Sequence, residues 1–254
     1  MELSYRFTKA WRRNFLTFFK TWRLNVIPPF LEPLLYLLAL GFGLGSFIEN
    51  VDGISYVRFI APALVSISVM NASFFECTYT SFVRMYYLKT FDAMISTPVS
   101  IEEVIAGELL WGATRSTIYA TFMLPVLLLF GVVDLPSSLL IIPFAFLSGL
   151  LFASIAMCFT AITPNIDTLN YPMFLFITPM FLFSGTFFPL SLLPTTIQYL
   201  ALAILPLAHV VIVNRAITLS AINTATFLSI LWILAATSIF FFTSIKLMKR
   251  RLII

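Results

Sequence analysis

The chain has 254 residues, of which 60% are apolar and only 10% are charged, with a formal net charge of +4. An ordinary soluble domain carries about 25% charged residues, and a soluble fold of this size could not hide so much apolar surface from water. The composition therefore excludes a soluble enzyme, a nucleic-acid-binding domain and a disordered chain, and it leaves an integral membrane protein.

Residues 1–25 are predicted to form an amphipathic interface helix ahead of the first span. The basic residues of this segment fall largely off its apolar face. We expect the helix to lie in the headgroup layer, either as a topology anchor or as a surface that also touches a cytoplasmic partner. The apolar residues recur at spacings of three and four, as one helix face requires, and are Leu3, Phe7, Trp11, Phe15, Phe18 and Trp22.

Six windows are long and apolar enough to cross a bilayer, which takes about 20 residues. A further apolar stretch, from Leu190 to Val213, is broken by Pro194 and Pro206, so we expect short helices that dip into the outer leaflet. The predicted fold is therefore an all-α integral membrane fold. The six predicted spans are residues 26–47, 57–79, 105–132, 136–162, 171–188 and 227–247.

Basic residues gather on one side of these spans. Twelve of the fifteen fall in the N-terminal segment, in the loop after the second span or in the tail, whereas Arg58 and Arg215 lie on the opposite side and Arg115 lies inside the third span. The positive-inside rule therefore places both termini in the cytoplasm, and the even number of crossings that follows favours six.

Gly41 and Gly45 have GxxxG spacing at the outer end of the first span. Small residues at this spacing let the backbone of another helix approach closely. We favour packing within the chain over a contact between two copies of it.

The segment between the second and third spans, residues 84–115, is the longest polar stretch outside the N-terminal segment, and it faces the cytoplasm. A short amphipathic helix is predicted over about residues 85–96, and Pro98 separates it from the next helix. Ser100 with Glu103 three residues later has the spacing of a capping box at a helix start.

Charged residues within or near the spans need partners, because a charge at the bilayer centre costs at least about 2.5 kcal/mol. Interface snorkelling, a buried ion pair or a network that couples the cytoplasmic loop to the spans would each meet that need. Glu108 and Arg115 share a helix face, but seven residues rise about 10.5 Å, too far for a simple ion pair along the helix. We hypothesise that Arg115 pairs with Glu76 or Glu108. The charged residues concerned are Glu32, Glu76, Glu108 and Arg115.

Motifs of other membrane proteins are missing from the sequence. There is no G-x-x-x-x-G-K-[ST] phosphate loop, so the chain cannot bind ATP in that manner, and no HExxH or histidine cluster that would hold a metal. His209 and Ser184 lack the context of catalytic residues. An ion-coupled secondary transporter of a hydrophobic compound is the main alternative, but it would place ionisable residues near the midplane, where this chain has few.

Two motifs resemble the ABC-2 class of ATP-binding-cassette export permeases. The similarity spans nearly the whole chain and is greatest to the subfamily of lipo-oligosaccharide (nodulation-factor) and drug export permeases. The second motif is FLFSGTFFPLSLLP, Phe181 to Pro194, followed by LPLAH, Leu205 to His209, and by Arg215. The first motif comprises Arg84, Lys89, Thr90, Asp92, Met94, Pro98, Gly107, Glu108, Trp111 and Gly112.

The resemblance implies a half-transporter in which residues 1–254 form one transmembrane domain. Such a permease forms a homodimer in the cell inner membrane and recruits two copies of a separate ATPase subunit. ATP and Mg would bind to that partner, and this chain would hold no catalytic residue, cofactor or metal and bind no nucleic acid. Spans one, two and five would line the path.

The resemblance also assigns residues to roles. Residues 84–103 would be the coupling loop, and residues 188–213 the outer re-entrant hairpin. The residues expected to contact the ATPase are Arg84, Lys89, Thr90, Phe91, Asp92 and Pro98. The residues of the hairpin motif are Gly185, Phe188, Pro189, Pro194, Pro206, His209 and Arg215.

The predicted spans are rich in Phe, Leu and Ile and carry few fixed polar groups. Such walls suit an apolar tail, so the cargo is expected to be amphiphilic, either a lipid-linked oligosaccharide or a hydrophobic drug. The expected mechanism is alternating access, in which closure of the ATPase dimer moves the loop around Lys89 and Asp92 and tilts the second and third spans.

Overall fold

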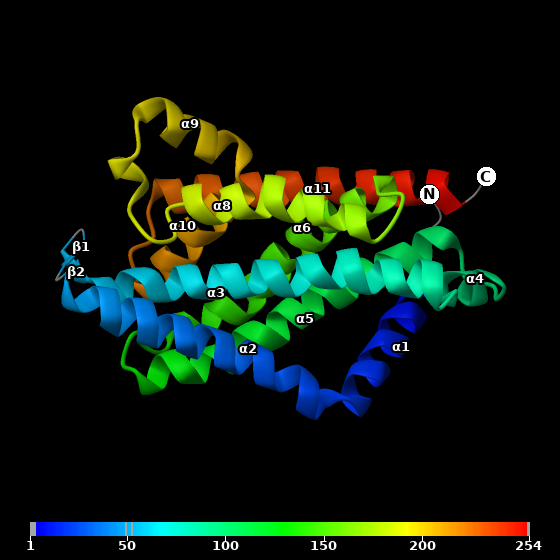
Figure 1. The fold of residues 1–254 in the computed structure, drawn as a ribbon, viewed down its shortest axis with the longest axis horizontal. Coiled ribbons are helices and arrows are strands. Elements are labelled where there is room, and N and C mark those ends of the chain that lie inside the picture. Colours follow the sequence, from blue (N-terminus) through cyan, green and yellow to red (C-terminus); the bar gives the residue numbers. More distant parts are fainter. Residues whose placement is uncertain (1–3, 49, 52, 253–254) are drawn as a thin grey trace.

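A computed structural model describes residues 4–48, 50–51 and 53–252 (Figure 1). The described fold is helical apart from two antiparallel two-residue strands, β1 (Asn50–Val51) and β2 (Ile54–Ser55). The α-helices are α1 (Phe7–Lys20), α2 (Trp22–Tyr36), α3 (Tyr56–Phe75), α4 (Thr90–Ile95), α5 (Ile101–Leu129), α6 (Ile141–Ile162), α7 (Asn170–Pro172), α8 (Thr178–Phe183), α9 (Thr195–Ile204), α10 (Pro206–Thr218) and α11 (Thr224–Leu252).

Short tighter or wider helical turns join these α-helices. The π-helical turns are η1 (Leu37–Gly43), η3 (Glu76–Thr80), η4 (Val83–Tyr87) and η7 (Met173–Ile177). The 3₁₀ turns are η2 (Leu44–Ser46), η5 (Ser137–Leu140), η6 (Asp167–Leu169) and η8 (Leu190–Leu192). Because η3 and η4 continue α3 without a break in the helical path, the second predicted span becomes one stretch from Tyr56 to Tyr87.

The bundle is built around α3, α5 and α6, which pack against one another. Helix α11 covers α6, α10 packs against both α3 and α11, and α1 packs on α5. Figure 1 shows α4 and both chain ends at one end of the molecule, with the strands and α9 toward the other. The elements expected in the cytoplasm therefore lie together at one end.

Three described helical stretches are long and apolar enough to cross a membrane, and they match the second, fourth and sixth predicted spans. A fourth candidate is the pair α9 and α10, which is bent by 92° at Leu205, just before Pro206. The first, third and fifth predicted spans correspond to α2 with η1 and η2, to α5, and to α7 through α8. The three stretches are Tyr56–Tyr87, Ser137–Ile162 and Thr224–Leu252.

Two predicted boundaries are wrong. The fifth span was predicted to reach Phe188, but α8 ends at Phe183, because Gly185 adopts φ +70° and turns the chain out of the helix. The short loop helix was predicted over residues 85–96, but α4 begins only at Thr90. Lys89 is in the left-handed conformation, at φ 50°, and a non-glycine residue there ends the preceding helix.

Close helix contacts occur where the sequence places small residues. Gly41 and Gly45 both face Val57 on α3, as expected for packing within the chain. A Cβ added to Gly41 would lie 3.4 Å from the Val57 side chain, and a Cβ added to Gly45 would lie 3.7 Å from it. Nearer the end of the bundle that carries α4, Gly107 of α5 lies directly against Ala10 of α1. Small residues at such positions allow the helix backbones to approach each other.

Helix α1 packs on α5, and the stripe of residues that it buries differs from the predicted apolar face, of which Phe18 is buried. Its buried residues are Ala10, Asn14 and Phe18, a stripe that faces α5. The Trp11 indole donates a hydrogen bond of 2.9 Å to Thr114 Oγ1 on α5. The position of α1 therefore depends on specific contacts with α5.

Candidate functional site

Four ionisable side chains meet inside the bundle, close to the end that carries α4. The Arg84 guanidinium lies between two carboxylates, with its Nη2 2.6 Å from Glu76 Oε1 and 2.6 Å from Glu108 Oε2. Arg115 pairs with the other oxygen of Glu76. We call Glu76, Arg84, Glu108 and Arg115 the buried charge cluster. Two carboxylates and two guanidiniums balance, so the cluster carries no formal net charge.

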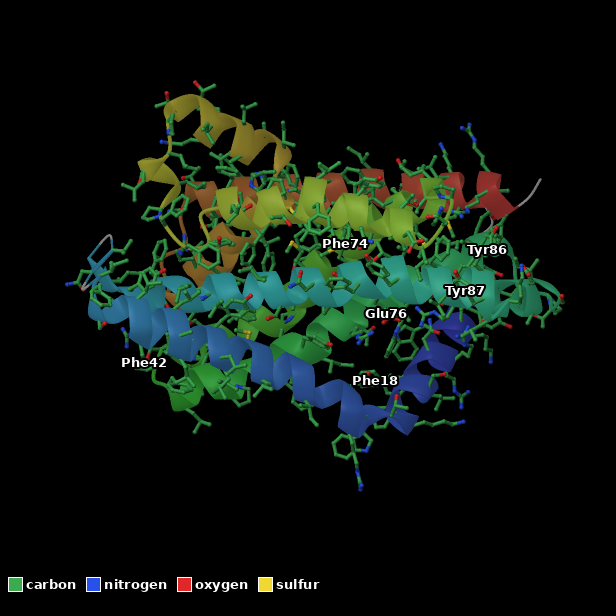
Figure 2. All side chains as sticks on the ribbon, viewed as in Figure 1. Phe18, Phe42, Phe74, Glu76, Tyr86 and Tyr87 are labelled. Carbon is green, nitrogen blue, oxygen red and sulfur yellow. The ribbon has the colours of Figure 1, made fainter. Side chains whose placement is uncertain are left out.

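Burial explains why the cluster needs so many partners. Glu76 and Glu108 are 1% and 0% exposed, and a buried carboxylate is tolerated only when charge and hydrogen bonds compensate for lost water. Figure 2 shows Glu76 between α3 and α1, close to Phe18. The pairing that was hypothesised for Arg115 is present, with Glu76 as the partner.

Neutral side chains complete the cluster and connect it to three segments. Asn14 on α1 donates to Glu108 Oε1 at 2.7 Å, and Ser81 donates to Glu108 Oε2 at 2.8 Å. Trp111 Nε1 on α5 donates to Glu76 Oε1 at 2.8 Å. The cluster therefore joins α1, the Tyr56–Tyr87 helix and α5.

Local helix geometry brings the charges together. Glu76 is the first residue of the π-helical turn η3, and Arg84 is the second residue of η4, so each lies in a wide turn of the same helix. Such π-turns are rare and often occur at functional sites, since each one rotates the residues that follow it. Glu108 and Arg115 lie two helical turns apart on α5, which lets each reach a different residue of the opposite helix.

A small polar recess of about 130 Å³ opens beside the cluster, between α1, the start of α2, η3 and α5. Polar side chains of this recess border the buried charges. Its lining residues are Asn14, Thr17, Phe18, Thr21, Asn25, Glu76, Thr80, Arg84, Trp111 and Arg115.

The segment after the cluster is exposed and short. Lys89 and Asp92 have 67% and 60% of their side chains exposed, and Lys89 Nζ lies 3.9 Å from Asp92 Oδ2. Phe91, between them in α4, is fully buried and holds the helix against the bundle. Exposed apolar side chains flank this surface, including Tyr86, Tyr87, Leu88 and Ile95. The loop therefore presents a mixed charged and apolar face.

The N-terminal segment holds the far end of this loop. Ser100 and Glu103 form the predicted capping box at the start of α5. The amide and hydroxyl of Ser4 both donate to Glu103 Oε1, and the Arg6 guanidinium donates to the carbonyl of Pro98. Burial acts to raise the pKa of Glu103, but the hydrogen bonds from Ser4 and Ser100 outweigh it and hold that pKa below its ordinary value.

The C-terminal end of α11 contacts the same region. Lys249 Nζ lies 2.8 Å from Glu102 Oε1, at the first turn of α5. Arg251 donates to the carbonyl of Thr160 near the end of α6 and lies over the ring of Phe82 at 5.5 Å. The base of the loop is therefore bound to both ends of the chain.

The opposite end of the bundle has its own polar contacts, which hold the bent pair α9 and α10. Arg215 Nη2 donates to the carbonyls of Gly185 at 3.0 Å and Phe59 at 3.3 Å. His209 Nε2 lies 2.7 Å from the Leu202 carbonyl, which can only accept, so this nitrogen carries the proton. The His209 ring also stacks on Trp232, with ring centroids 4.4 Å apart.

Comparison with known proteins gives one consistent result. The model of the ABC-2 type transporter family matches residues 5–219. The chain belongs to the ABC-2 type transporter family. It is 37% identical to nodulation protein J of Rhizobium meliloti over 243 residues, which cover 96% of this chain and 92% of that protein.

Two further relatives extend the comparison. Nodulation protein J of Bradyrhizobium diazoefficiens is 35% identical, over 98% of this chain and 95% of that protein. The inner membrane transport permease YadH of Escherichia coli is 24% identical, over 72% of each chain. No solved structure matches the chain. The relatives and the family model identify a transport permease of the ABC-2 type rather than an enzyme.

The structure of this ABC-2 permease divides the residues expected at the coupling surface into two sets. Lys89, Asp92 and Pro98 are exposed and Thr90 is half-buried. Arg84, by contrast, is 8% exposed and lies within the buried charge cluster, and Phe91 is 0% exposed. Neither of these two side chains reaches the surface to which the resemblance assigned it.

The remaining expected residues fall in three places. Glu76, Glu108 and Arg115 come together in the cluster, whereas the side chain of Glu32 lies outside the described part of the structure. In the hairpin motif, Pro189 and Pro206 are buried, Phe188 is half-buried and Pro194 is exposed.

Sequence reasoning missed two neutral side chains that bond to the cluster, Asn14 and Ser81. Asn14 lies on the apolar face of α1, so it is a polar residue at a position that the pattern predicts to be buried, whereas Ser81 lies just beyond the predicted end of the second span, where no pattern predicts burial. A polar residue on a face predicted to be buried was the available signal of a buried polar contact, because a buried polar side chain needs a hydrogen-bond partner.

Gly185 of the permease provides a test of the outer turn. We expect Gly185→Ala to lower the stability of the protein for two reasons. Alanine in the left-handed conformation costs about 1–2 kcal/mol. Overpacking adds about 1–3 kcal/mol, because the new Cβ would lie 2.9 Å from Leu190 Cγ. Gly131→Ala is the matched control, with φ +63° but open space around it. Thermal unfolding of the purified proteins measures both, and equal losses would show that the Leu190 contact has no effect.

Proposed function

We propose that this chain is one half of an ATP-driven exporter, in which two copies form the path and two copies of a separate ABC ATPase subunit supply the energy. The whole chain would form one transmembrane domain with cytoplasmic termini in the inner membrane. Membership of the ABC-2 family supports this proposal, as does the lack of a phosphate loop in the sequence. ATP and Mg would bind to the partner.

The observation that carries the coupling role is the position of α4. Its charged pair, Lys89 and Asp92, faces outward, while Phe91 is buried beneath it. The preceding helical turn contributes Arg84 to the buried charge cluster. A partner that pushes on the exposed face of α4 would therefore move a short segment that is continuous with the cluster.

The cluster would transmit that movement. It joins α1, the Tyr56–Tyr87 helix and α5 through ion pairs that require close contact. Charged pairs in a low-dielectric interior resist separation, because each separated member would be left unpaired. Segments held in this way would tilt together, and this is the motion that alternating access requires of the second and third spans.

The cargo we propose is an amphiphile, such as a lipid-linked oligosaccharide or a hydrophobic drug. The apolar spans would accept an apolar tail. Similarity to proteins named nodulation protein J and to an inner membrane transport permease supports export across the inner membrane.

The test is the association of the permease with its ATPase. We expect Asp92→Lys, and separately Lys89→Glu, to reduce co-purification of the co-expressed ATPase subunit and ATP-dependent transport by about tenfold, an effect of about 1.4 kcal/mol or more at an interface. Both residues are exposed, so membrane insertion and thermal stability should stay unchanged.

The matched control is Asp167→Lys, which reverses an exposed carboxylate in the loop between α6 and α7, at the same end of the bundle. It should leave ATPase association intact. Normal ATPase binding and transport by both α4 variants would contradict the coupling role. Vectorial transport by the purified chain without any ATPase would instead favour an ion-coupled transporter.

A further inference from the structure

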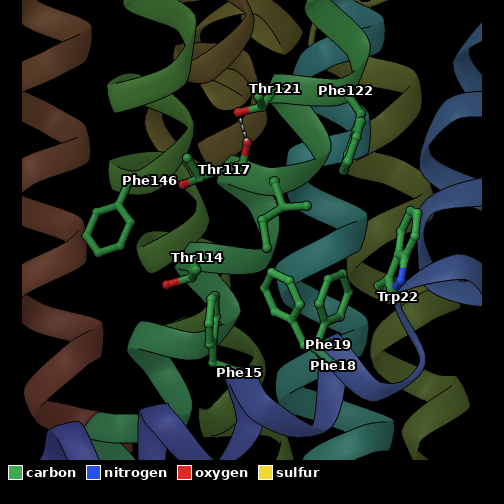
Figure 3. A pocket seen from close by; sticks show the side chains of 10 residues that line it. Phe15, Phe18, Phe19, Trp22, Thr114, Thr117, Thr121, Phe122 and Phe146 are labelled. Atoms are coloured by element: carbon green, nitrogen blue, oxygen red, sulfur yellow. Dashed lines mark hydrogen bonds between the residues drawn. The ribbon is translucent and has the colours of Figure 1, made fainter.

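A groove lies between α1 and α5, with Trp22 at the start of α2 and Phe146 of α6 also lining it. It has a volume of about 560 Å³, within the range of sites that take small-molecule ligands. Figure 3 shows its aromatic side chains rising from α1 toward a row of threonines on α5. We call it the α1–α5 groove. Its lining residues are Phe15, Phe18, Phe19, Trp22, Thr114, Thr117, Ile118, Thr121, Phe122 and Phe146.

The groove offers an occupant almost no hydrogen-bonding capacity. The hydroxyls of the three threonines donate to backbone carbonyls of α5: Thr114 to Leu110 at 2.7 Å, Thr117 to Ala113 at 3.0 Å, and Thr121 to Thr117 at 2.8 Å. Their methyl groups, the aromatic rings and the Ile118 side chain form the rest of the lining. An apolar chain is the occupant that such a lining favours.

Two basic residues lie at one end of the groove. A second recess, of about 520 Å³, shares Phe19 and Trp22 with it and is lined in addition by Lys20, Thr21 and Arg23. No carboxylate occurs from Ser4 to Asn25, so the two cations face no acid of their own segment. A ligand with an apolar tail and an anionic head fits both recesses at once, tail in one and head in the other.

We propose that the α1–α5 groove binds one acyl chain of an anionic phospholipid from the cytoplasmic leaflet, with its phosphate against Lys20 and Arg23. The lipid would be a resident of the junction between α1 and α2 rather than the transported cargo. Phe18 lines both this groove and the polar recess of the charge cluster. A lipid in the groove would therefore pack against the same helix that supplies Asn14 to Glu108.

The first experiment tests the headgroup contact. The full-length protein is reconstituted in vesicles of equal parts phosphatidylcholine and phosphatidylglycerol, extracted in mild detergent, and its retained lipids are counted by native mass spectrometry. We expect wild type to retain phosphatidylglycerol about tenfold over phosphatidylcholine, and Lys20→Glu with Arg23→Glu to bring the ratio close to one. Lys246→Glu with Arg250→Glu, which reverses two exposed cations on α11, should leave the ratio unchanged.

The second experiment tests the acyl chain. Ile118→Trp places a large ring inside the groove, and we expect it to remove one tightly retained phospholipid per chain. Ile239→Trp is the control, because Ile239 is 64% exposed on α11 and does not line the groove. Thermal unfolding checks that each variant is folded, and a variant that is not folded is replaced by Thr117→Phe, which fills the same groove.

The outcomes separate the sources of the lipid. Loss of one retained phosphatidylglycerol in the groove variant and loss of selectivity in the charge variant support the proposal. Equal retention of both phospholipids by wild type, or no change in Ile118→Trp, overturns it. Release of the retained lipid only during ATP turnover by the complex with its ATPase also overturns it, since the lipid would then be cargo. The retention assay needs no ATPase, so its failure would leave the exporter assignment standing.

Discussion

Glu76→Gln is expected to lower the stability of the permease by about 3–5 kcal/mol, the cost of breaking a buried ion pair on one side. The change removes one negative charge but almost no volume. Arg84 and Arg115 both contact Glu76, whose side chain is 1% exposed, so the variant leaves Arg84 with Glu108 alone and takes from Arg115 the carboxylate that it contacts. Both guanidiniums stay charged at any pH that the protein tolerates.

Thermal unfolding in detergent, followed by tryptophan fluorescence, measures this effect, because Trp111 donates directly to Glu76. Asp92→Asn is the control: it also removes one carboxylate charge, but Asp92 is exposed and 3.9 Å from its cation, so the change should stay within about 0.5 kcal/mol. Glu76→Gln with Arg115→Gln should recover part of the loss. No recovery would mean that shape rather than charge balance accounts for it.

The cluster shows how far a sequence can lead toward a site of this kind. Acids are scarce in the spans, so the choice of partner for Arg115 was limited to Glu76 and Glu108, and the structure selects Glu76. Arg84 was misplaced because the pattern of polar residues marks it as the start of a loop. Two π-helical turns instead carry the helix through Tyr87 and leave Arg84 buried. Hydropathy does not encode such turns.

The periodicity of apolar residues also could not predict contacts between residues that are far apart in the sequence. Asn14 and Glu108 are 94 residues apart, and only the docking of α1 on α5 brings them within 2.7 Å. The apolar repeat of α1 predicted an aromatic stripe as its principal face, whereas the buried stripe passes through Ala10. Packing selects the smallest side chain there because Gly107 brings the two backbones together, and size complementarity between distant segments is a tertiary property. Local patterns predicted structure more accurately: the capping box of α5 was predicted correctly, because it depends on residues within one helical turn.

Gly107→Ala is expected to displace α1 from α5, because the added Cβ would lie 2.6 Å from Ala10 Cβ and 2.7 Å from the backbone oxygen of Phe7. Overpacking of this kind costs about 1–3 kcal/mol. Losing the Asn14 hydrogen bond to the Glu108 carboxylate would add about 1.5–3 kcal/mol. The sign of the change in stability is informative, because replacing glycine by alanine within a helix ordinarily stabilises the helix by about 1 kcal/mol.

Gly43→Ala is the matched control for this change, because a Cβ at Gly43 meets only a backbone oxygen of its own helical segment, at 3.9 Å. It should leave thermal unfolding unchanged or raise the midpoint. Ala10→Gly combined with Gly107→Ala should recover only part of the loss, since it removes the contact between the two Cβ atoms and keeps the contact with Phe7. A stable Gly107→Ala protein with full ATPase coupling would show that close docking of α1 is dispensable. A destabilised one that recovers in the double variant would place the interface helix within the structure that holds the charge cluster together.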